Sequence, residues 1–233
     1  KFLKNQKHRI IFNKDPGFVT DEHFGSSTPG SNILRQIISV KNGLKEIKTK
    51  YTLKIRSDCY FNSNKISNLN INKLLKNNIQ NFLEERIITS SIGSLNQLET
   101  KILYHYSDWF NFGLTEDLNK LWTNVIIEEN DINFFSRLSK EKKNIYGKDW
   151  DLKYTAEQFI YYKSISNKFN NQLIHAHDFS QNKLDEAENY LINNFYLVDP
   201  DDVDFIFPKY DQKINKKLKI NNTNIRSKEL VFL

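Results

Sequence analysis

The chain has 233 residues, of which 39% are hydrophobic and 13% aromatic, so it can bury a substantial core and is not a disordered protein. No apolar run approaches the roughly 20 residues that span a bilayer. The net charge of +6 suits nucleic acid, anionic lipid or phosphorylated ligands without choosing among them. The single cysteine, Cys59, excludes an intrachain disulfide and favours a reducing compartment.

In chain order, the first predicted element is a short strand over 8–12, followed by an Asp-Pro-Gly turn at 15–17. A loop over 25–31 then precedes a helix that Ser31 caps and that runs to about Ile47, because its apolar residues recur at helical spacing.

The next predicted element is a strand over 51–56, in which apolar and polar residues alternate. Leu53 and Ile55 lie on one side, and Lys54 and Arg56 lie on the other. This pattern predicts a core strand whose apolar side faces the interior.

The rest of the chain continues to alternate predicted strands with predicted helices. Thr155 and Gln158 form a capping box that marks the start of one of these helices. Such alternation is typical of an α/β domain. The expected elements are a helix over 71–83, strands over 86–91 and 102–114, helices over 115–125, 155–169 and 183–195, and a strand over 205–207.

The motif Arg56-Ser57-Asp58 ends the strand over 51–56. Ligands of open α/β sheets bind outside the carboxyl ends of strands, where the Asp58 carboxylate can hold a divalent cation that bridges phosphate oxygens. Arg56 can pair with that carboxylate or with a phosphate. The alternative is an ion pair that only closes the strand end. The chain has no glycine-rich dinucleotide fingerprint, no phosphate-binding loop and no nucleophile elbow.

Two further segments carry candidate binding residues. Asn32 and Arg35 share one face at the start of the helix before the strand, where free N–H groups favour anions. His105, Asp108 and Trp109 lie in an aromatic stretch that can raise the pKa of a carboxylate, as a general base requires. The alternatives are a surface arginine and an ordinary aromatic core.

Weaker candidates come from the second half of the chain. Glu157 lies in the first turn of a helix, where the helix dipole alone favours a carboxylate. His175 and His177 would share one face of a strand, as in some metal sites, but no third ligand follows at a suitable spacing.

In its order of motifs, the chain resembles the WavE-like lipopolysaccharide synthesis family of bacterial proteins, which are thought to be GT-A-type glycosyltransferases. The resemblance covers about residues 8–165 and is most specific around Asp58 and Asp108. It rests on the segments DPG (15–17), NILRQIISVKNGL (32–44), TKYTLKIRSD (49–58), RIITSS (86–91), HYSDWFNFGLTEDLNKLW (105–122) and AEQFIYY (156–162).

This resemblance implies a single α/β domain over 1–211, with a GT-A-like (Rossmann-like) mixed sheet flanked by helices, and a basic C-terminal tail over 212–233. Since the chain lacks Met and the family's opening strand, we expect that strand upstream of Lys1. The implied function is transfer of a sugar from a nucleotide-sugar donor to a glycan or lipid-linked acceptor. The implied place is the bacterial cytoplasm, at the cytoplasmic face of the inner membrane, to which the tail can bind.

The resemblance also distributes roles among the candidate residues, with Arg56 in place of the usual first acid of the donor motif. A Mn²⁺ or Mg²⁺ ion on Asp58 is the implied cofactor. The donor-binding residues are Asp15, Asn32, Arg35, Arg56 and Asp58; the catalytic candidates are Asp108, then Glu116 and Asp117; and the acceptor-binding residues are His105, Trp109 and Glu157.

Two other functions remain open at this point. One is a non-catalytic carbohydrate-binding or assembly subunit built on a degenerate transferase fold, because the donor motif lacks its first acid. The other is binding of nucleic acid through the basic ends, which we do not expect because basic and aromatic residues do not interleave in any known module.

Overall fold

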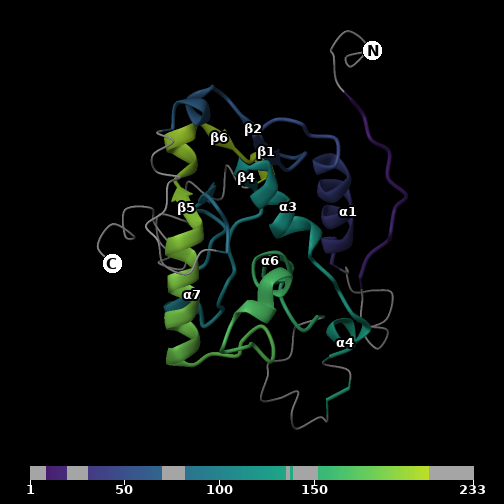
Figure 1. The fold of residues 1–233 in the computed structure, drawn as a ribbon, viewed down its shortest axis with the longest axis vertical. Helices are drawn as coiled ribbons and strands as arrows, with labels where there is room; N and C mark the ends of the chain where they lie inside the picture. Colours follow the sequence, from purple (N-terminus) through teal and green to yellow (C-terminus); the bar gives the residue numbers. More distant parts are fainter. Residues whose placement is uncertain (1–8, 20–30, 70–81, 135–136, 139–151, 210–233) are drawn as a thin grey trace.

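The computed structural model describes residues 9–19, 31–69, 82–134, 137–138 and 152–209. A four-stranded sheet forms its centre and helices flank it, while a short two-stranded sheet lies at one end (Figure 1). The strands are β1 (Tyr51–Ile55), β2 (Tyr60–Phe61), β3 (Ile87–Ser90), β4 (Phe110–Leu114), β5 (Phe195–Val198) and β6 (Phe205–Ile206). The α-helices are α1 (Ile33–Leu44), α2 (Gln97–Thr100), α3 (Thr115–Thr123), α4 (Glu129–Ile132), α6 (Ala156–Tyr161) and α7 (Gln181–Asn194).

The main sheet is mixed, with strand order β1-β4-β3-β5. β4 pairs antiparallel with both β1 and β3, and β3 pairs parallel with β5. The smaller sheet pairs β2 with β6. The predicted class, a mixed α/β fold with a mixed sheet flanked by helices, is therefore confirmed at this level.

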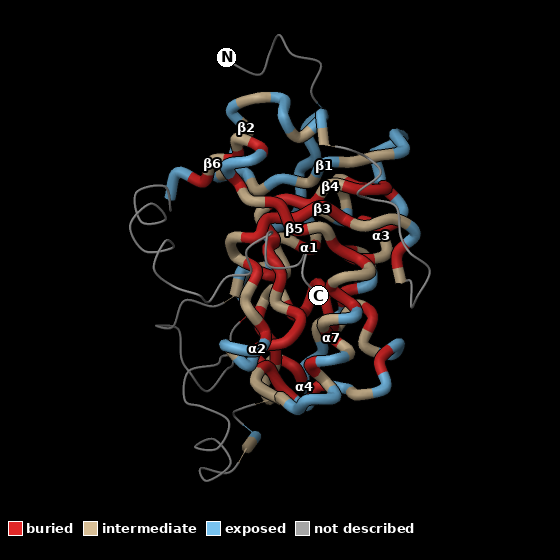
Figure 2. The backbone as a smooth tube through the Cα atoms, turned by 90° about the vertical axis from the view of Figure 1, so that its left-hand side faces the viewer, coloured by how far each residue is buried: buried red, intermediate tan, exposed pale blue. Residues whose placement is uncertain are grey.

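The alternation of side chains along β3 separates two hydrophobic cores. Ile87 points to the larger core, which also contains residues of α1, α3, α6 and α7, and Ile88 points to the smaller core beside β2 and β6. On β5, Leu197 and Val198 divide in the same way. Successive strand residues face opposite sides of a sheet, and all four residues of β3 are buried, so this strand is covered on both faces. Figure 2 shows this buried centre as a continuous band along the sheet.

The strand β1 is in the predicted place, but its orientation differs from the prediction. β1 lies at the edge of the main sheet, and its apolar residues Leu53 and Ile55 are 38% and 37% exposed. The polar side faces inward instead: Thr52 shares a hydrogen bond with Thr115, and the Lys54 ammonium donates to the carbonyl of Asp108. A buried polar side chain needs such partners, and β1 has them on its inner face.

The predicted strand over 8–12 is wrong for its described part, since residues 9–12 form no strand. These residues lie along the outer side of α1, and Phe12 is 90% exposed. Side chains tether the segment: Arg9 pairs with Glu46, and Asn42 donates to Asn13. Residues 9–12 therefore lie beside a helix rather than beside a strand with which they could pair.

The predicted strand over 102–114 is right only for its second half, β4. Before Phe110 the backbone is irregular, and Tyr104 has a φ of +58°. Side chains satisfy the backbone here, because Tyr104 N donates to Gln97 Oε1 and Ser107 N donates to Ser94 Oγ. The aromatic content of the segment reflects burial rather than strand pairing.

The predicted helix over 155–169 is divided. The capping box of Thr155 and Gln158 is present and starts α6, but the helix ends at Tyr161 and a 3₁₀ helix, η5 (Lys163–Lys168), follows. The helices and strands expected over 31–47, 86–91, 115–125, 183–195 and 205–207 are confirmed within a few residues. The expected helix over 71–83 and the tail over 212–233 lie outside the described residues, except for Phe82 and Leu83.

In the part of the chain that the structure describes, no helix is both long enough and apolar enough to cross a membrane.

Candidate functional site

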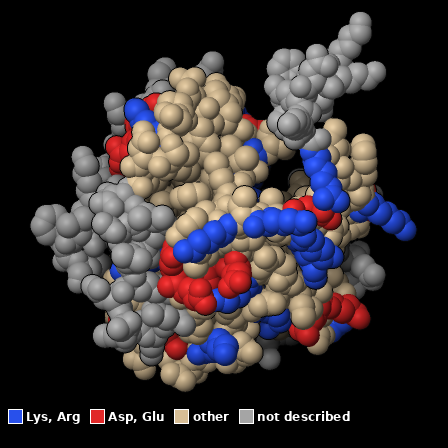
Figure 3. Space-filling model, turned by 45° about the horizontal axis from the view of Figure 1, so that its top comes forward, with Lys and Arg blue, Asp and Glu red and all other residues tan. Residues whose placement is uncertain are grey.

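A pocket of about 460 Å³ opens between the first two turns of α1 and the carboxyl end of β1. We call it the α1–β1 pocket. It brings together four of the five residues predicted to bind a donor, although they come from two separate segments. Its polar lining includes Asn32, Arg35, Gln36, Lys54, Arg56 and Asp58. On this end of the molecule, basic and acidic side chains lie next to one another (Figure 3).

Arg56 is the central cation of the pocket. Its Nε and Nη2 donate to the two carboxylate oxygens of Asp58 at 3.0 and 3.1 Å, and Nη1 lies 3.3 Å from the buried carboxylate of Asp108. Burial lowers the pKa of Arg56, but the hydrogen bond to Asp58 and the charges of Asp108 and Asp58 outweigh burial and raise it. The guanidinium is therefore held charged and oriented, because a planar fork matches carboxylate geometry.

Asp58 is the exposed partner of this ion pair. The hydrogen bond from Arg56 lowers the pKa of the Asp58 carboxyl below its usual value. Ser57 and Asp58 both line the pocket, so the strand end offers a ligand one carboxylate and one cation side by side. Arg56 and Asp58 thus form an ion pair at the strand end and at the same time line the pocket. The two interpretations of the Arg56-Ser57-Asp58 motif are compatible in this geometry.

Lys54 is a pocket residue that the sequence analysis did not select. Its ammonium donates to the Asp108 carbonyl and lies 4.6 Å from the centre of the Trp122 ring. Burial lowers the pKa of Lys54 to about 8. The signal was present in the alternation of β1, which places Lys54 on the same side as Arg56, but a lysine on an apparent core strand is usually assumed to face solvent.

Arg35 supplies a second oriented guanidinium on the α1 side of the pocket. It donates two bonds of 2.7 Å to the carboxylate of Asp15 and one of 2.8 Å to Asn32 Oδ1, and its Cζ lies 4.0 Å above the ring of Phe18. The hydrogen bonds from Arg35 and from the N–H of Gly17 lower the pKa of Asp15 to about 2. Asp15 therefore reaches the site through Arg35 rather than as part of the pocket lining.

The start of α1 contributes two polar amide side chains, Asn32 and Gln36, to the pocket lining. Asn32 occupies the N-cap position but makes no capping bond with its side chain, since Ser31 Oγ accepts from Ile33 N instead. The Oε1 atom of Gln36 is buried and has no hydrogen-bond partner among the described residues. Gln36 is a second pocket residue that the sequence analysis missed, and its spacing of four residues from Asn32 would have indicated a shared face.

A divalent cation on Asp58 is not favoured by this donor set. Both oxygens of the carboxylate already accept from Arg56. Within the described ranges, no group of three His, Cys, Asp or Glu side chains could hold a metal ion. Mg²⁺ is commonly held by one or two carboxylates together with waters and substrate phosphates, and the described lining offers one carboxylate, which Arg56 already engages. The residues as arranged do not fit a protein-held metal, and the predicted metal role of Asp58 remains a prediction.

The predicted catalytic residue Asp108 lies beneath Arg56. It is 3% exposed and lies two residues before β4, and its carboxylate faces the Arg56 guanidinium. Trp109 follows it and packs against Phe205 and Phe207, and Phe207 in turn lies 5.3 Å from the Arg56 guanidinium. Asp108 and Trp109 therefore support the position of Arg56 from behind.

The structure does not bring Glu116 and Asp117 to the α1–β1 pocket. They begin α3, which follows the opposite end of β4 from Asp108. The fully buried Asp117 accepts from the N–H groups of Glu84 and Glu85 and from the Lys120 ammonium. That geometry fits a structural role, in which Asp117 anchors the backbone that leads into β3.

His105 and Glu157 form a separate small cluster. His105 Nδ1 lies 3.0 Å from the Thr155 hydroxyl, and Nε2 lies 3.6 Å from a Glu157 carboxylate oxygen. Neither residue lines the α1–β1 pocket. These two acceptor-binding predictions therefore concern a neighbouring surface and not the pocket itself.

His175 and His177 lie in an irregular segment rather than on the predicted strand. His177 N donates to His175 Nδ1, and burial lowers the pKa of both imidazoles. The described residues around them supply no group of three metal ligands.

The fold and the pocket define a mixed α/β protein with a cation-lined pocket at the carboxyl end of an edge strand. The family model described as WavE lipopolysaccharide synthesis matches residues 5–228, which is nearly the whole sequence. The chain belongs to this family, which gives it a role in lipopolysaccharide synthesis. No curated protein and no solved structure matches the chain.

Proposed function

We propose that this protein is a glycosyltransferase that moves a sugar from a nucleoside diphosphate donor to a hydroxyl of a growing lipopolysaccharide or capsule glycan at the cytoplasmic face of the bacterial inner membrane. The observation that carries the proposal is the convergence of Arg35, Lys54 and Arg56 on one pocket at the end of β1. A diphosphate carries concentrated negative charge, and pre-oriented guanidinium groups recognise phosphate oxygens in pairs.

The two arginines retain free donors for such a ligand. Their hydrogen bonds within the described part of the chain use three of the five N–H groups of Arg56 and three of those of Arg35. The remaining N–H groups and the Lys54 ammonium can face phosphate oxygens in the pocket. Because the acidic partners fix each guanidinium, little side-chain entropy is lost on binding.

In the proposed reaction, the bond from the sugar C1 to the donor diphosphate breaks and a bond from the acceptor oxygen to C1 forms. The charge that develops on the leaving diphosphate would be stabilised by Arg56 and Lys54. The acceptor proton passes to a base. Of the three predicted catalytic residues only Asp108 lies next to the pocket, since Glu116 and Asp117 lie at the other end of β4. Asp108 is buried behind Arg56, so Arg56 would have to move for this carboxylate to reach an acceptor. Asp58 orients Arg56 throughout.

The test is binding of nucleoside diphosphates and their sugar conjugates to the full chain by calorimetry. We expect Arg56→Ala and Arg35→Ala each to weaken binding at least tenfold. Lys41→Gln is the matched control, because Lys41 is an exposed cation of α1 that does not line the pocket. Equal affinity in all four proteins would overturn the proposal.

A second candidate function is favoured by one observation: the described residues of the pocket lining include a single carboxylate, and Arg56 engages both of its oxygens. A non-catalytic subunit that binds a nucleotide sugar or a glycan needs no base. Donor turnover separates the two candidates. Binding without release of nucleoside diphosphate, in the presence of lipopolysaccharide acceptors, would favour the non-catalytic subunit.

A further inference from the structure

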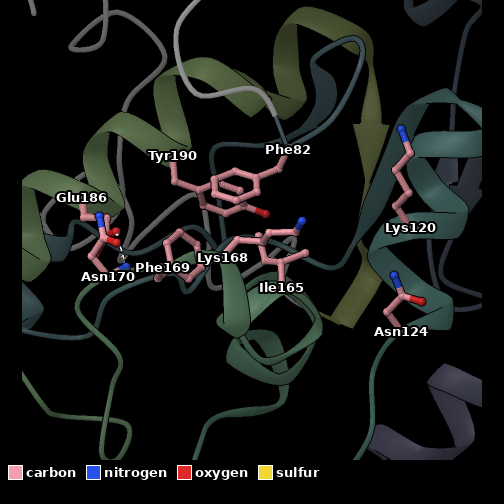
Figure 4. Close-up of a pocket in the computed structure, with 9 residues that line it drawn as sticks. All are labelled: Phe82, Lys120, Asn124, Ile165, Lys168, Phe169, Asn170, Glu186 and Tyr190. Atoms are coloured by element: carbon pink, nitrogen blue, oxygen red, sulfur yellow. Dashed lines mark hydrogen bonds between the residues drawn. The ribbon is translucent and has the colours of Figure 1, made fainter.

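A second pocket, of about 500 Å³, lies between α3, η5 and α7 (Figure 4). We call it the α3–α7 pocket. Its lining includes Phe82, Lys120, Asn124, Lys168, Phe169 and Tyr190. Its volume is within the roughly 300–1,000 Å³ that small-molecule sites occupy. No residue of the α1–β1 pocket contributes to it.

The two pockets lie toward opposite ends of the main sheet. Arg56 follows the end of β1 that pairs with Phe110, whereas the α3–α7 pocket is built from α3, which follows Leu114, and from Tyr190, which precedes β5. A five-residue strand such as β4 spans about 13 Å. The α3–α7 pocket is therefore a separate site and not an extension of the first.

One wall of the α3–α7 pocket is aromatic. The Phe82 ring centre lies 5.3 Å from that of Phe169 and 5.4 Å from that of Tyr190. Phe169 and Tyr190 are 5% and 2% exposed, so their rings are fixed by packing, while Phe82 is partly exposed. Rigid aromatic faces next to polar groups suit a ligand with one apolar and one polar face, such as a pyranose ring.

The Tyr190 hydroxyl provides an unused polar group inside this wall. It is buried and has no hydrogen-bond partner among the described residues. Figure 4 shows the Tyr190 ring crossing the pocket from α7, with its hydroxyl on the side of Ile165 and Lys168. A buried hydroxyl without a partner is costly, and a sugar hydroxyl in the pocket would supply one.

The charged side chains among the described lining residues are Lys120, Lys168 and Glu186. Lys168 is exposed at the pocket rim, and none of its ammonium contacts to described residues is an ion pair. Lys120 is held by Asp117 at 2.9 Å. Glu186 is already used, because its two carboxylate oxygens accept from the N–H groups of Asn170 and Asn171 and so fix the rim. The side-chain amides of Asn124 and Asn170 can bind hydroxyl groups.

We propose that the α3–α7 pocket binds an acidic sugar, a hexose that carries a carboxylate or a phosphate. Its ring packs on the aromatic wall, a hydroxyl pairs with Tyr190, and its acidic group pairs with Lys168. This site is distinct from the donor site proposed above, and it does not depend on that function. It gives the protein a second point of contact with a charged glycan.

The proposal is tested by calorimetric titration of the full chain with glucuronic acid, glucose 6-phosphate and glucose. We expect one or both acidic sugars to bind at least tenfold more tightly than glucose, and the comparison of the two acids identifies the preferred group. Lys168→Gln should weaken binding of the acidic sugar at least fivefold, and Tyr190→Phe about threefold. Tyr190→Phe removes only the unpaired hydroxyl, so its fold is retained.

Lys41→Gln serves as the control and should bind the acidic sugar like the unmodified protein. Equal binding of glucose and the acidic sugars would overturn the proposal. So would wild-type affinity in both Lys168→Gln and Tyr190→Phe. Loss of acidic-sugar binding in Arg56→Ala alone would place the ligand in the α1–β1 pocket, which also overturns it.

Discussion

The guanidinium of Arg56 donates to both carboxylate oxygens of Asp58, at 3.0 and 3.1 Å, and also faces the buried carboxylate of Asp108 at 3.3 Å. One cation thus joins an exposed and a buried acid at the end of a single strand. The arrangement explains why an arginine stands two residues before Asp58: it neutralises Asp108 and presents its remaining N–H groups to the pocket.

We expect Arg56→Lys to weaken both donor binding and stability, although it keeps the positive charge. An ammonium cannot form the two-pronged bond to Asp58 while it also reaches Asp108. Nucleoside diphosphate binding should weaken at least tenfold, and the free energy of unfolding should fall by about 1–2 kcal/mol. Calorimetry and urea unfolding measure the two effects.

The control for this substitution is Arg9→Lys, which alters an exposed ion pair with Glu46 and should change stability by less than about 0.5 kcal/mol. If Arg56→Lys binds the diphosphate as tightly as the unmodified chain, the paired geometry has no role in recognition.

Lys54 should make stability rise with pH. Its pKa is about 8 in the fold, below the roughly 10.4 of an unfolded chain. Below pH 8 both states hold the proton and the cost of burying the charge is fully present. Between about pH 8 and 10.4 only the unfolded state still binds the proton, so folding becomes more favourable, by on the order of 3 kcal/mol.

Comparison with Lys54→Met isolates this effect, because the ionisation of buried tyrosines at high pH is common to both proteins. Urea unfolding at pH 7, 8, 9 and 10 should show the unmodified chain gaining stability relative to Lys54→Met, while Lys41→Met should follow the unmodified chain. Parallel curves for Lys54→Met and the unmodified chain would show that Lys54 is not buried as the structure places it.

We expect Asp117 to be required for folding and not for donor binding. Its buried carboxylate accepts from the N–H groups of Glu84 and Glu85. Asp117→Ala should lower the free energy of unfolding by about 2–3 kcal/mol, because the N–H groups of Glu84 and Glu85 and the Lys120 ammonium lose a charged partner. The affinity for nucleoside diphosphates should stay within twofold.

The exposed neighbour provides the comparison: Glu116→Gln should change stability by less than about 0.5 kcal/mol. A stable Asp117→Ala protein that has lost sugar transfer would instead restore the predicted catalytic role of Asp117.

The sequence was most informative where local spacing decides position. The helical spacing of α1 placed Asn32 and Arg35 on one face, and the alternation of β1 placed Arg56 and Asp58 at its end. The family resemblance assigned both segments to one donor site, and the structure places these four residues in one pocket. Both patterns depend on residues close together in the chain, and the order of the motifs indicated how the two segments meet.

What the sequence could not indicate was which face of β1 is buried. Leu53 and Ile55 predicted a core strand with its apolar side buried. The inward-facing side of β1 is instead the polar one, which contains Thr52 and Lys54, because Thr115 and Asp108 from distant segments bond to that side. The structural role of Asp117 could not be predicted for the same reason, because its backbone partners lie some thirty residues earlier, just before β3. Long-range hydrogen bonds leave no local pattern.

Removal of divalent metal should have little effect on donor recognition. Charge on the diphosphate would be met by Arg35, Lys54 and Arg56, and Asp58, the one carboxylate among the described lining residues, is already bonded to Arg56. We expect EDTA to change the affinity for nucleoside diphosphates by less than threefold, measured by calorimetry before and after chelation. A tenfold loss that Mn²⁺ restores, and that Asp58→Asn abolishes, would instead establish Asp58 as a metal ligand. That outcome would require the Arg56–Asp58 pair to open when the donor binds.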